Sequence, residues 1–304
     1  MSPSVAPVLV VLAAGAARRY GGCKPLAPVG PSGEAVIDLV ASDAVASGFG
    51  AIVLVIHPET GPAIRYHVER CWPSSVNVSF AEQRVPLGTT HATLAARSLV
   101  GIEHPFAVAN ADDVYGREAF DLLSHQLTSN HDEHALVGFQ LANSVVTDDP
   151  VTRGICEVDA SGHLVAMTER RQVSRLKGGH DFSSLDGLQP DKLPGDAAVS
   201  VNLWGFRPEI WDIFDAAMDA SGLDEQAIVD QIARGVEVPK SEVLLPEVVG
   251  ATIESRTGLA VRVLRTDTKC VGVTHADDLP VVQGELARQV AWGIRPSRLW
   301  ANVG

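Results

Sequence analysis

Three short stretches of this sequence combine residue types that act on phosphates and on nucleotide bases. One is basic and begins with a glycine, one is a polar loop that begins with a glutamine, and one ends in adjacent aspartates. They are Gly15 to Lys24, Gln83 to Thr90, and Asn110 to Asp113. Each follows an apolar run long enough for a buried strand, so we expect all three at strand ends.

The stretch Gly15 to Lys24 has the composition of a polyphosphate-binding loop. Small residues let backbone N–H groups approach phosphate oxygens closely, and Arg18, Arg19 and Lys24 supply positive charge. The stretch is not a P-loop, because no Gly-Lys-Ser/Thr occurs in it, and two alanines break the spacing of a dinucleotide fingerprint. The alternative is an ordinary strand-to-helix turn with solvated basic residues.

The loop that begins at Gln83 has the residues needed to recognise a flat base. Gln83 offers a donor and an acceptor, as the edge of uracil, thymine or cytosine requires. Gly88 permits the backbone to lie against the base, and Thr89 and Thr90 are natural N-caps for the following helix. A capped strand-to-helix loop without a ligand is the alternative.

Asp112 and Asp113 are candidate metal ligands. Two carboxylates that directly follow a central strand form a hard-oxygen site suited to Mg²⁺, and Asp112 is the better candidate. The alternative is an Asx-turn that caps the helix expected from about Arg117.

The charge of the whole chain limits its partners. The 304 residues carry a formal charge of −13, which argues against nucleic acid or an anionic membrane surface as a partner. The four cysteines lie far apart without a CxxC pair, so neither zinc nor a disulfide framework is indicated. Because the N-terminus lacks a basic region and no apolar stretch is long enough to span a membrane, we expect a cytoplasmic protein.

The first half of the chain alternates between strand and helix patterns. The strands expected before the three stretches are Val8–Ala13, Val76–Ala81 and Pro105–Ala109, and a further strand is expected at Ala51–Ile56. Helices are expected at 34–47, 62–71 and 89–100, with Asp38 and Asp43 on the surface of the first. This alternation predicts an α/β fold whose parallel sheet has helices on both faces. Ligands of such sheets bind beyond the carboxyl ends of the strands, where the three stretches fall.

The second half of the chain predicts further strands and a hairpin. The strands are expected at 135–141, 198–206 and 259–264, and the hairpin at 154–165 with its turn at 159–162. The segment 174–194 is polar and glycine-rich, and we interpret it as an insert or lid over a substrate pocket. Helices are expected at 120–130, 210–220, 226–234, 242–253 and 280–293.

The first stretch resembles the nucleotide-binding loop of the sugar-1-phosphate nucleotidylyltransferases, whose pattern is L-A-A-G-x-G-x-R followed by K-P-L. The matching residues are Leu12, Ala13, Ala14, Gly15, Arg19, Lys24, Pro25 and Leu26. Ala17 stands where the family usually has its second glycine. The resemblance implies that Leu12 to Gly15 bind nucleotide and that Arg19 and Lys24 are catalytic.

The resemblance extends to the other two stretches. Gln83, Pro86 and Gly88 fall at the spacing of the family's base-binding loop, and Thr89 follows in its Gly-Thr run. Asn110 is then a nucleotide-binding residue, and Asp112 stands at the family's metal aspartate with Asp113 beside it.

On the sugar side the resemblance is less regular. It implies that Gly154 and Glu169 bind the sugar, that Arg170 binds its phosphate in place of the family's lysine, and that Asn202 contacts the sugar. A surface ion pair is the alternative for Glu169 and Arg170. Gly272 stands where the family has a second metal aspartate, which puts a second protein ligand in doubt.

The resemblance covers almost the full chain and implies a fold and an activity. The fold is a three-layer Rossmann-like α/β fold with a mixed, mostly parallel sheet, of the nucleotide-diphospho-sugar transferase type. We expect a single domain over 1–304, with a nucleotide-binding half at 1–150, a sugar-binding half at 151–275 and a C-terminal helix and tail at 276–304. The implied activity is Mg²⁺-dependent transfer of a nucleotidyl group to a sugar or cyclitol phosphate, with release of pyrophosphate.

Two alternatives remain open. A metal-dependent glycosyltransferase has a related fold, although Arg19 and Lys24 count against it because nucleotide-sugar users need no triphosphate clamp. A non-catalytic nucleotide-sugar sensor is suggested only by Gly272. The spacing around Gln83 resembles that of the uridylyltransferases within the family, which implies UTP or dTTP as the nucleotide. Assembly into a homo-oligomer is left open.

Overall fold

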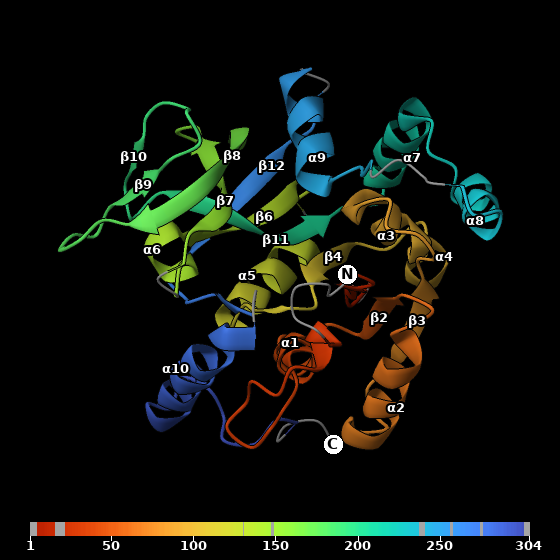
Figure 1. Cartoon of the computed structure of the whole chain (residues 1–304), viewed down its shortest axis with the longest axis horizontal. Helices are drawn as coiled ribbons and strands as arrows, with labels where there is room; N and C mark the ends of the chain where they lie inside the picture. Colours follow the sequence, from red (N-terminus) through yellow and green to blue (C-terminus); the bar gives the residue numbers. More distant parts are fainter. Residues whose placement is uncertain are drawn as a thin grey trace.

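The computed structural model describes residues 5–15, 22–129, 131–146, 149–236, 241–255, 258–273 and 276–300. Its centre is an eleven-stranded sheet with helices on both faces, and Figure 1 shows this layered arrangement. The prediction of an α/β fold built on a mixed sheet is confirmed.

The parallel part of the sheet comes from the first half of the chain. Strand β1 (Val8–Ala13) lies between β2 (Ala51–Ile56) and β4 (Phe106–Asn110), and β3 (Val78–Glu82) lies outside β2. All of these neighbours are parallel. Because the side chains of β1 alternate in direction, Leu9 and Val11 enter the core on one face, and Val8 and Val10 enter the core on the other.

The second half of the chain adds antiparallel strands. Strand β11 (Ala198–Phe206) lies antiparallel to β4, to β6 (His134–Gln140) and to β7 (Val151–Val158). Strand β7 forms the predicted hairpin with β8 (Leu164–Arg175), and β12 (Val261–Thr266) runs parallel to β6. Strands from both halves of the chain therefore share one sheet.

The helices cover the two faces of this sheet (Figure 1). The core on one face includes side chains of α1, α2, α5 and α10, and the core on the other includes side chains of α3, α7 and α9. Their bounds are α1 Val36–Ala46, α2 Gly61–Cys71, α3 Thr89–Ala95, α4 Arg97–Val100, α5 Arg117–Thr128, α6 Leu141–Ser144, α7 Ile210–Ser221, α8 Glu225–Ala233, α9 Leu245–Glu254 and α10 Leu279–Ala291. Among the described residues, no helix combines the length and the apolar character needed to span a membrane.

Asp38 and Asp43 are buried in α1, so the prediction that they lie on a helix surface is wrong. The Asp38 carboxylate accepts hydrogen bonds from the indole of Trp72 at 2.7 Å and from the backbone N–H of Ala35 at 2.8 Å. Asp43 accepts two hydrogen bonds from one nitrogen of Arg295, at 2.9 and 3.0 Å. Burial is tolerated because each carboxylate has donors that offset the loss of water.

The segment 174–194 is more regular than a lid. It contains the end of β8 and two short strands, β9 (Phe182–Ser184) and β10 (Lys192–Leu193), which continue the sheet beyond β8. Phe182 and Leu193 are buried, which explains why this polar segment folds onto the sheet edge. None of its residues lines either of the two pockets described below, and its role as an insert or lid stays a prediction.

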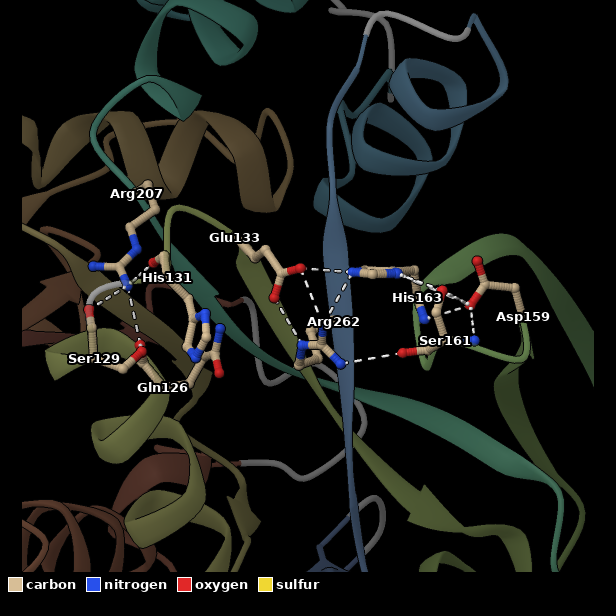
Figure 2. A network of polar contacts seen from close by, with 9 residues as sticks. All are labelled: Gln126, Ser129, His131, Glu133, Asp159, Ser161, His163, Arg207 and Arg262. Carbon is tan, nitrogen blue, oxygen red and sulfur yellow. Dashed lines mark hydrogen bonds and ion pairs between the residues drawn. The ribbon is translucent and has the colours of Figure 1, made fainter.

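A polar network fixes the β7–β8 hairpin to the neighbouring strands (Figure 2). Glu133, just before β6, accepts two hydrogen bonds from Arg262 of β12, at 2.7 and 3.0 Å, and its carboxylate lies 2.7 Å from the ring of His163 beyond the hairpin turn. Hydrogen bonds from Arg262 and His163 lower the pKa of Glu133 to about 2.

Arg207 holds the end of α5 in a similar way, through the carbonyls of Gln126, Leu127, Ser129 and His131.

Replacing Arg295 with methionine would leave the Asp43 carboxylate buried without its cation. We expect the free energy of unfolding to fall by about 3–5 kcal/mol, as is usual when one partner of a buried ion pair is removed. The matched control is Lys192→Met, because Lys192 pairs with Asp181 on the surface and its loss should change stability little. Chemical denaturation measures both variants, and equal losses would contradict the role given to Arg295.

Candidate active site

The three predicted stretches follow β1, β3 and β4 at the carboxyl edge of the parallel strands. Leu12 of β1 lies opposite Asn110 of β4, and Gln83 directly follows β3. A pocket of about 140 Å³ lies at the ends of β1 and β4, and it is lined by Leu12, Ala13, Gly15, Lys24, Pro25, Ala111 and Asp112. Ala14 is buried in the core beside it, and Arg19 lies outside the described residues. This pocket is our candidate for the phosphates of a nucleotide.

Lys24 reaches across this pocket to the first aspartate. It opens a short helical turn, Lys24–Leu26, in which Pro25 is buried and fixes the direction of the chain. The Lys24 ammonium donates a hydrogen bond to the Asp112 carboxylate. Both side chains stay partly exposed, so the pair is open to a ligand entering the pocket.

Asp113 occupies space that Gly272 leaves free. The short strands β5 (Asp113–Val114) and β13 (Val271–Gly272) pair, and this pairing sets Asp113 opposite Gly272. A side chain at position 272 would collide with Oδ1 of Asp113. Glycine at position 272 therefore leaves room for the carboxylate of Asp113. Burial, followed by the charge of Asp112, raises the pKa of Asp113 to about 6.

A chain of amide hydrogen bonds orients Asp113. The indole N–H of the fully buried Trp204 donates to Oδ1 of Asn202 at 2.8 Å, and Nδ2 of Asn202 donates to Oδ1 of Asn110 at 2.7 Å. Nδ2 of Asn110 then donates to Oδ2 of Asp113 at 3.0 Å. Asn202 has a positive φ of 63°, and it lies where β11 departs from its regular register with β6. Its amide supports the acidic pair as well as lining the neighbouring pocket.

A second pocket, of about 310 Å³, lies on the other side of Asp113. Its lining residues are Asn110, Asp113, Thr152, Arg153, Gly154, Met167, Glu169, Ser200, Val201, Asn202, Leu244, Pro246 and Glu247. Three residues predicted to bind a sugar, Gly154, Glu169 and Asn202, are thus brought together here. The Glu169 carboxylate is also hydrogen-bonded to Arg171 at 2.9 Å on the surface.

Arg170 is not brought to this pocket. It is buried, and its guanidinium binds both oxygens of Asp186, at 2.8 and 3.1 Å, and the carbonyls of Leu188 and Pro190. Glu169, the preceding residue of β8, lines the pocket, whereas Arg170 does not. Arg170 therefore holds the 186–190 loop, which argues against its predicted role in substrate binding.

Arg153 is the pocket cation that sequence reasoning missed. It is partly buried, and its guanidinium donates to Oγ of Ser144 at 3.2 Å, to the backbone carbonyl of Thr152 at 2.8 Å and to the backbone carbonyl of Ser144. Arg153 and Asp113 both line the second pocket, and the charge of Arg153 acts to lower the pKa of Asp113 against the larger effects of burial and Asp112. The signal in the sequence was its position next to Gly154, although only the tertiary structure brings it to Asp113.

The loop after β3 is built differently from our expectation. Gly88 has a φ of +99°, and a side chain there would collide with the backbone of Val243, so glycine is required by this contact. Leu87 is buried against Ile228 of α8, while Pro86 is exposed.

The expected caps of α3 are also absent. Thr89 is the first residue of the helix, and its hydroxyl accepts a hydrogen bond from the N–H of Leu245 at 2.8 Å. The N-cap position is held by Gly88, and Thr90 is buried. The prediction that Thr89 and Thr90 cap the helix is therefore wrong.

A comparison with protein-family models shows which family the chain belongs to. The model of the nucleotidyl transferase family matches residues 9–237, which is most of the chain. This chain belongs to the nucleotidyl transferase family. No curated protein matches the chain. The first pocket of this nucleotidyl transferase lies wholly within the matched range, and the second extends beyond it to Leu244, Pro246 and Glu247. Members of the family generally use a divalent metal.

Asp113→Asn should change the pH dependence of stability. Since the pKa of Asp113 is raised from 3.8 to about 6 in the folded metal-free protein, ionisation of this carboxyl opposes folding as pH rises through that interval. We expect the asparagine variant to melt at a higher temperature than the wild type well above pH 6, and the difference to shrink as pH falls toward 3.8. Thermal unfolding over this range measures it. A melting-temperature difference that does not vary with pH would contradict the raised pKa.

Proposed function

We propose that this nucleotidyl transferase joins a nucleoside triphosphate to a sugar-1-phosphate or a cyclitol phosphate and releases pyrophosphate. The observation that carries the proposal is the pair of pockets on either side of Asp112 and Asp113. Lys24 lines the pocket at the end of β1, and Arg153 lines the pocket between β7 and β11. One cation in each pocket suits a reaction between two phosphates.

The acidic pair fits Mg²⁺ as the metal. Mg²⁺ in phosphate-transferring sites is usually held by one or two carboxylates, and water and substrate phosphates complete its shell. Asp112 and Asp113 supply two carboxylates, and the described residues contain no cluster of three or more metal-binding side chains. Asp112 and Asp113 would hold the ion. When bound, it would neutralise charge on the phosphates of the nucleotide.

The proposed reaction needs no general base. An oxygen of the acceptor phosphate, already negatively charged, forms a bond to the α-phosphorus, and the bond from that phosphorus to the bridging oxygen of the β-phosphate breaks. Pyrophosphate leaves with the electron pair. Lys24 and Arg19 would offset charge on the triphosphate, and Arg153 would position the acceptor phosphate in the second pocket. Catalysis in this account is positioning together with electrostatic stabilisation.

The finer assignments belong to the same proposal. UTP or dTTP is the favoured nucleotide, with Gln83 as the residue that contacts the base. Leu12, Ala13, Gly15 and Asn110 would contact the nucleotide, and Glu169 would bind hydroxyl groups of the acceptor. The chain would act as a single domain, which the sheet shared by both halves supports. Its proposed location is the cytoplasm.

A pyrophosphate-release assay tests the proposal directly. We expect pyrophosphate only when a nucleoside triphosphate, Mg²⁺ and a sugar or cyclitol phosphate are all present. Lys24→Ala and Arg19→Ala should each lower kcat/KM more than about tenfold, because charge-assisted phosphate contacts contribute roughly 1.5–3 kcal/mol. Lys192→Ala is the control for removal of a surface lysine. Release of free nucleoside diphosphate from a nucleotide sugar would instead indicate a glycosyltransferase.

Asp112→Asn should abolish Mg²⁺-dependent turnover and leave the fold intact. Because Gly272 supplies no carboxylate, we expect Mg²⁺ to bind weakly to the free protein and more tightly when a nucleoside triphosphate is present. Calorimetric titration with Mg²⁺ measures both states. Tight binding to the free protein would contradict this expectation.

Arg153→Met separates the two pockets kinetically. If Arg153 holds the acceptor phosphate, KM for that substrate should rise about tenfold while KM for the nucleoside triphosphate stays nearly constant. Arg70→Met is the matched control, since Arg70 is exposed on α2, packs over Tyr66 and lines neither pocket. An equal effect on both KM values would contradict the proposal that Arg153 binds the acceptor phosphate.

A further inference from the structure

The amide of Gln83 is held by two contacts inside the protein. Gln83 is almost fully buried after β3, and its Nε2 donates to the backbone carbonyl of Gly88 at 3.0 Å. The same nitrogen lies 3.1 Å from Nδ1 of His91, on the first turn of α3. Both partners lie on the chain segment that follows Gln83.

These contacts determine which way the amide faces and which tautomer His91 adopts. A carbonyl oxygen can only accept, so the NH₂ group of Gln83 must face Gly88. The second hydrogen of that NH₂ group is then directed to His91, whose Nδ1 must carry a lone pair. His91 is therefore neutral, with its proton on Nε2. Burial lowers the pKa of His91, the charge of Arg84 acts in the same direction, and Glu225 of α8 acts against it.

Gln83 consequently presents only an acceptor to a ligand. Both hydrogens of its NH₂ group are used within the protein, and no donor among the described residues bonds its Oε1. Our sequence-based expectation that Gln83 offers a donor and an acceptor to the base holds only for the acceptor.

The surrounding structure fixes the loop in this arrangement. The N–H of Val243 donates to the carbonyl of Leu87 at 2.9 Å, and the N–H of Thr90 donates to the carbonyl of Val243 at 3.0 Å. On the outer side, Glu225 accepts hydrogen bonds from the backbone and the guanidinium of Arg84, at 2.9 and 3.1 Å. The loop is thus bonded on two sides, which leaves rotation of the Gln83 amide as the simplest way to change what it offers.

We propose that His91 is a positioning residue that holds Gln83 as an acceptor, so that the enzyme selects bases with a ring N–H at the centre of their pairing edge. This inference rests on the proposed function, with Gln83 in contact with the base. Uracil, thymine and guanine have such an N–H. Cytosine and adenine have a ring nitrogen with a lone pair at that place, which would face the lone pairs of Oε1. The substrate class is therefore UTP, dTTP or GTP rather than CTP or ATP.

The kinetic test compares His91→Leu with His91→Asn. Leucine removes the acceptor, whereas the asparagine oxygen can take the place of Nδ1. We expect His91→Leu to lower the preference for UTP, dTTP and GTP over CTP and ATP about three- to tenfold, mainly through KM of the nucleotide. His91→Asn should keep the wild-type preference. A wild type that prefers CTP or ATP, or a His91→Leu variant with unchanged preference, would overturn the inference.

A spectroscopic test needs no substrate. NMR of isotope-labelled histidine in the full chain, assigned with His91→Asn, should show an unprotonated, hydrogen-bonded Nδ1 and a protonated Nε2 near neutral pH. Gln83→Leu should shift the Nδ1 signal toward that of a free imidazole. A proton on Nδ1 would overturn the inference even if His91→Leu fails to fold.

The two tests separate this inference from the proposed function. If the wild type makes pyrophosphate but its base preference does not depend on His91, the result supports the proposed transfer activity and contradicts the role of His91. If no nucleoside triphosphate is turned over with any acceptor phosphate, the proposed function is wrong, and the proposed base selection is then wrong as well.

Discussion

Asp112 and Asp113 repel each other at the end of β4, and much of the surrounding site offsets that repulsion. Lys24 approaches Asp112 from the loop after β1, while Asn110 donates to Asp113 and the charge of Arg153 favours its ionised form. These groups come from segments far apart in the sequence. Only the sheet, which sets β1 and β4 side by side and pairs β11 with β4 and β7, brings them to one place.

The support of this acidic pair extends into the core. Trp204 is fully buried and orients Asn202, which orients Asn110, which in turn donates to Asp113. Each step is a directional hydrogen bond between fixed donors and acceptors, so the position of the carboxylate depends on the packing of an indole three hydrogen bonds away. Gly272 contributes by leaving room, because any larger residue would displace Asp113. The site is thus specified by packing as much as by the residues that would touch substrate.

Much of the fold followed from local patterns, and the parts that did not depend on distant partners. The strands at Ala51–Ile56 and Ala198–Phe206 have the predicted bounds, because each is a long run of mainly apolar residues. Asp38 and Asp43 could not be recognised as buried, since the cation that pairs with Asp43 lies 252 residues away in the sequence. Arg170 was predicted to reach the second pocket, but Arg153 lines it instead. Side-chain direction in a hairpin depends on register, and the residue types alone gave no way to choose between them.

The central claim is that two phosphates react directly across the acidic pair, one held in each pocket. The stereochemistry at the α-phosphorus tests this claim most directly, with a single diastereomer of an α-thio nucleoside triphosphate as substrate. Direct in-line attack by the acceptor phosphate predicts inversion of configuration at that phosphorus in the nucleotide-sugar product. Retention of configuration would require two successive displacements through a covalent intermediate on the protein, and it would contradict this account.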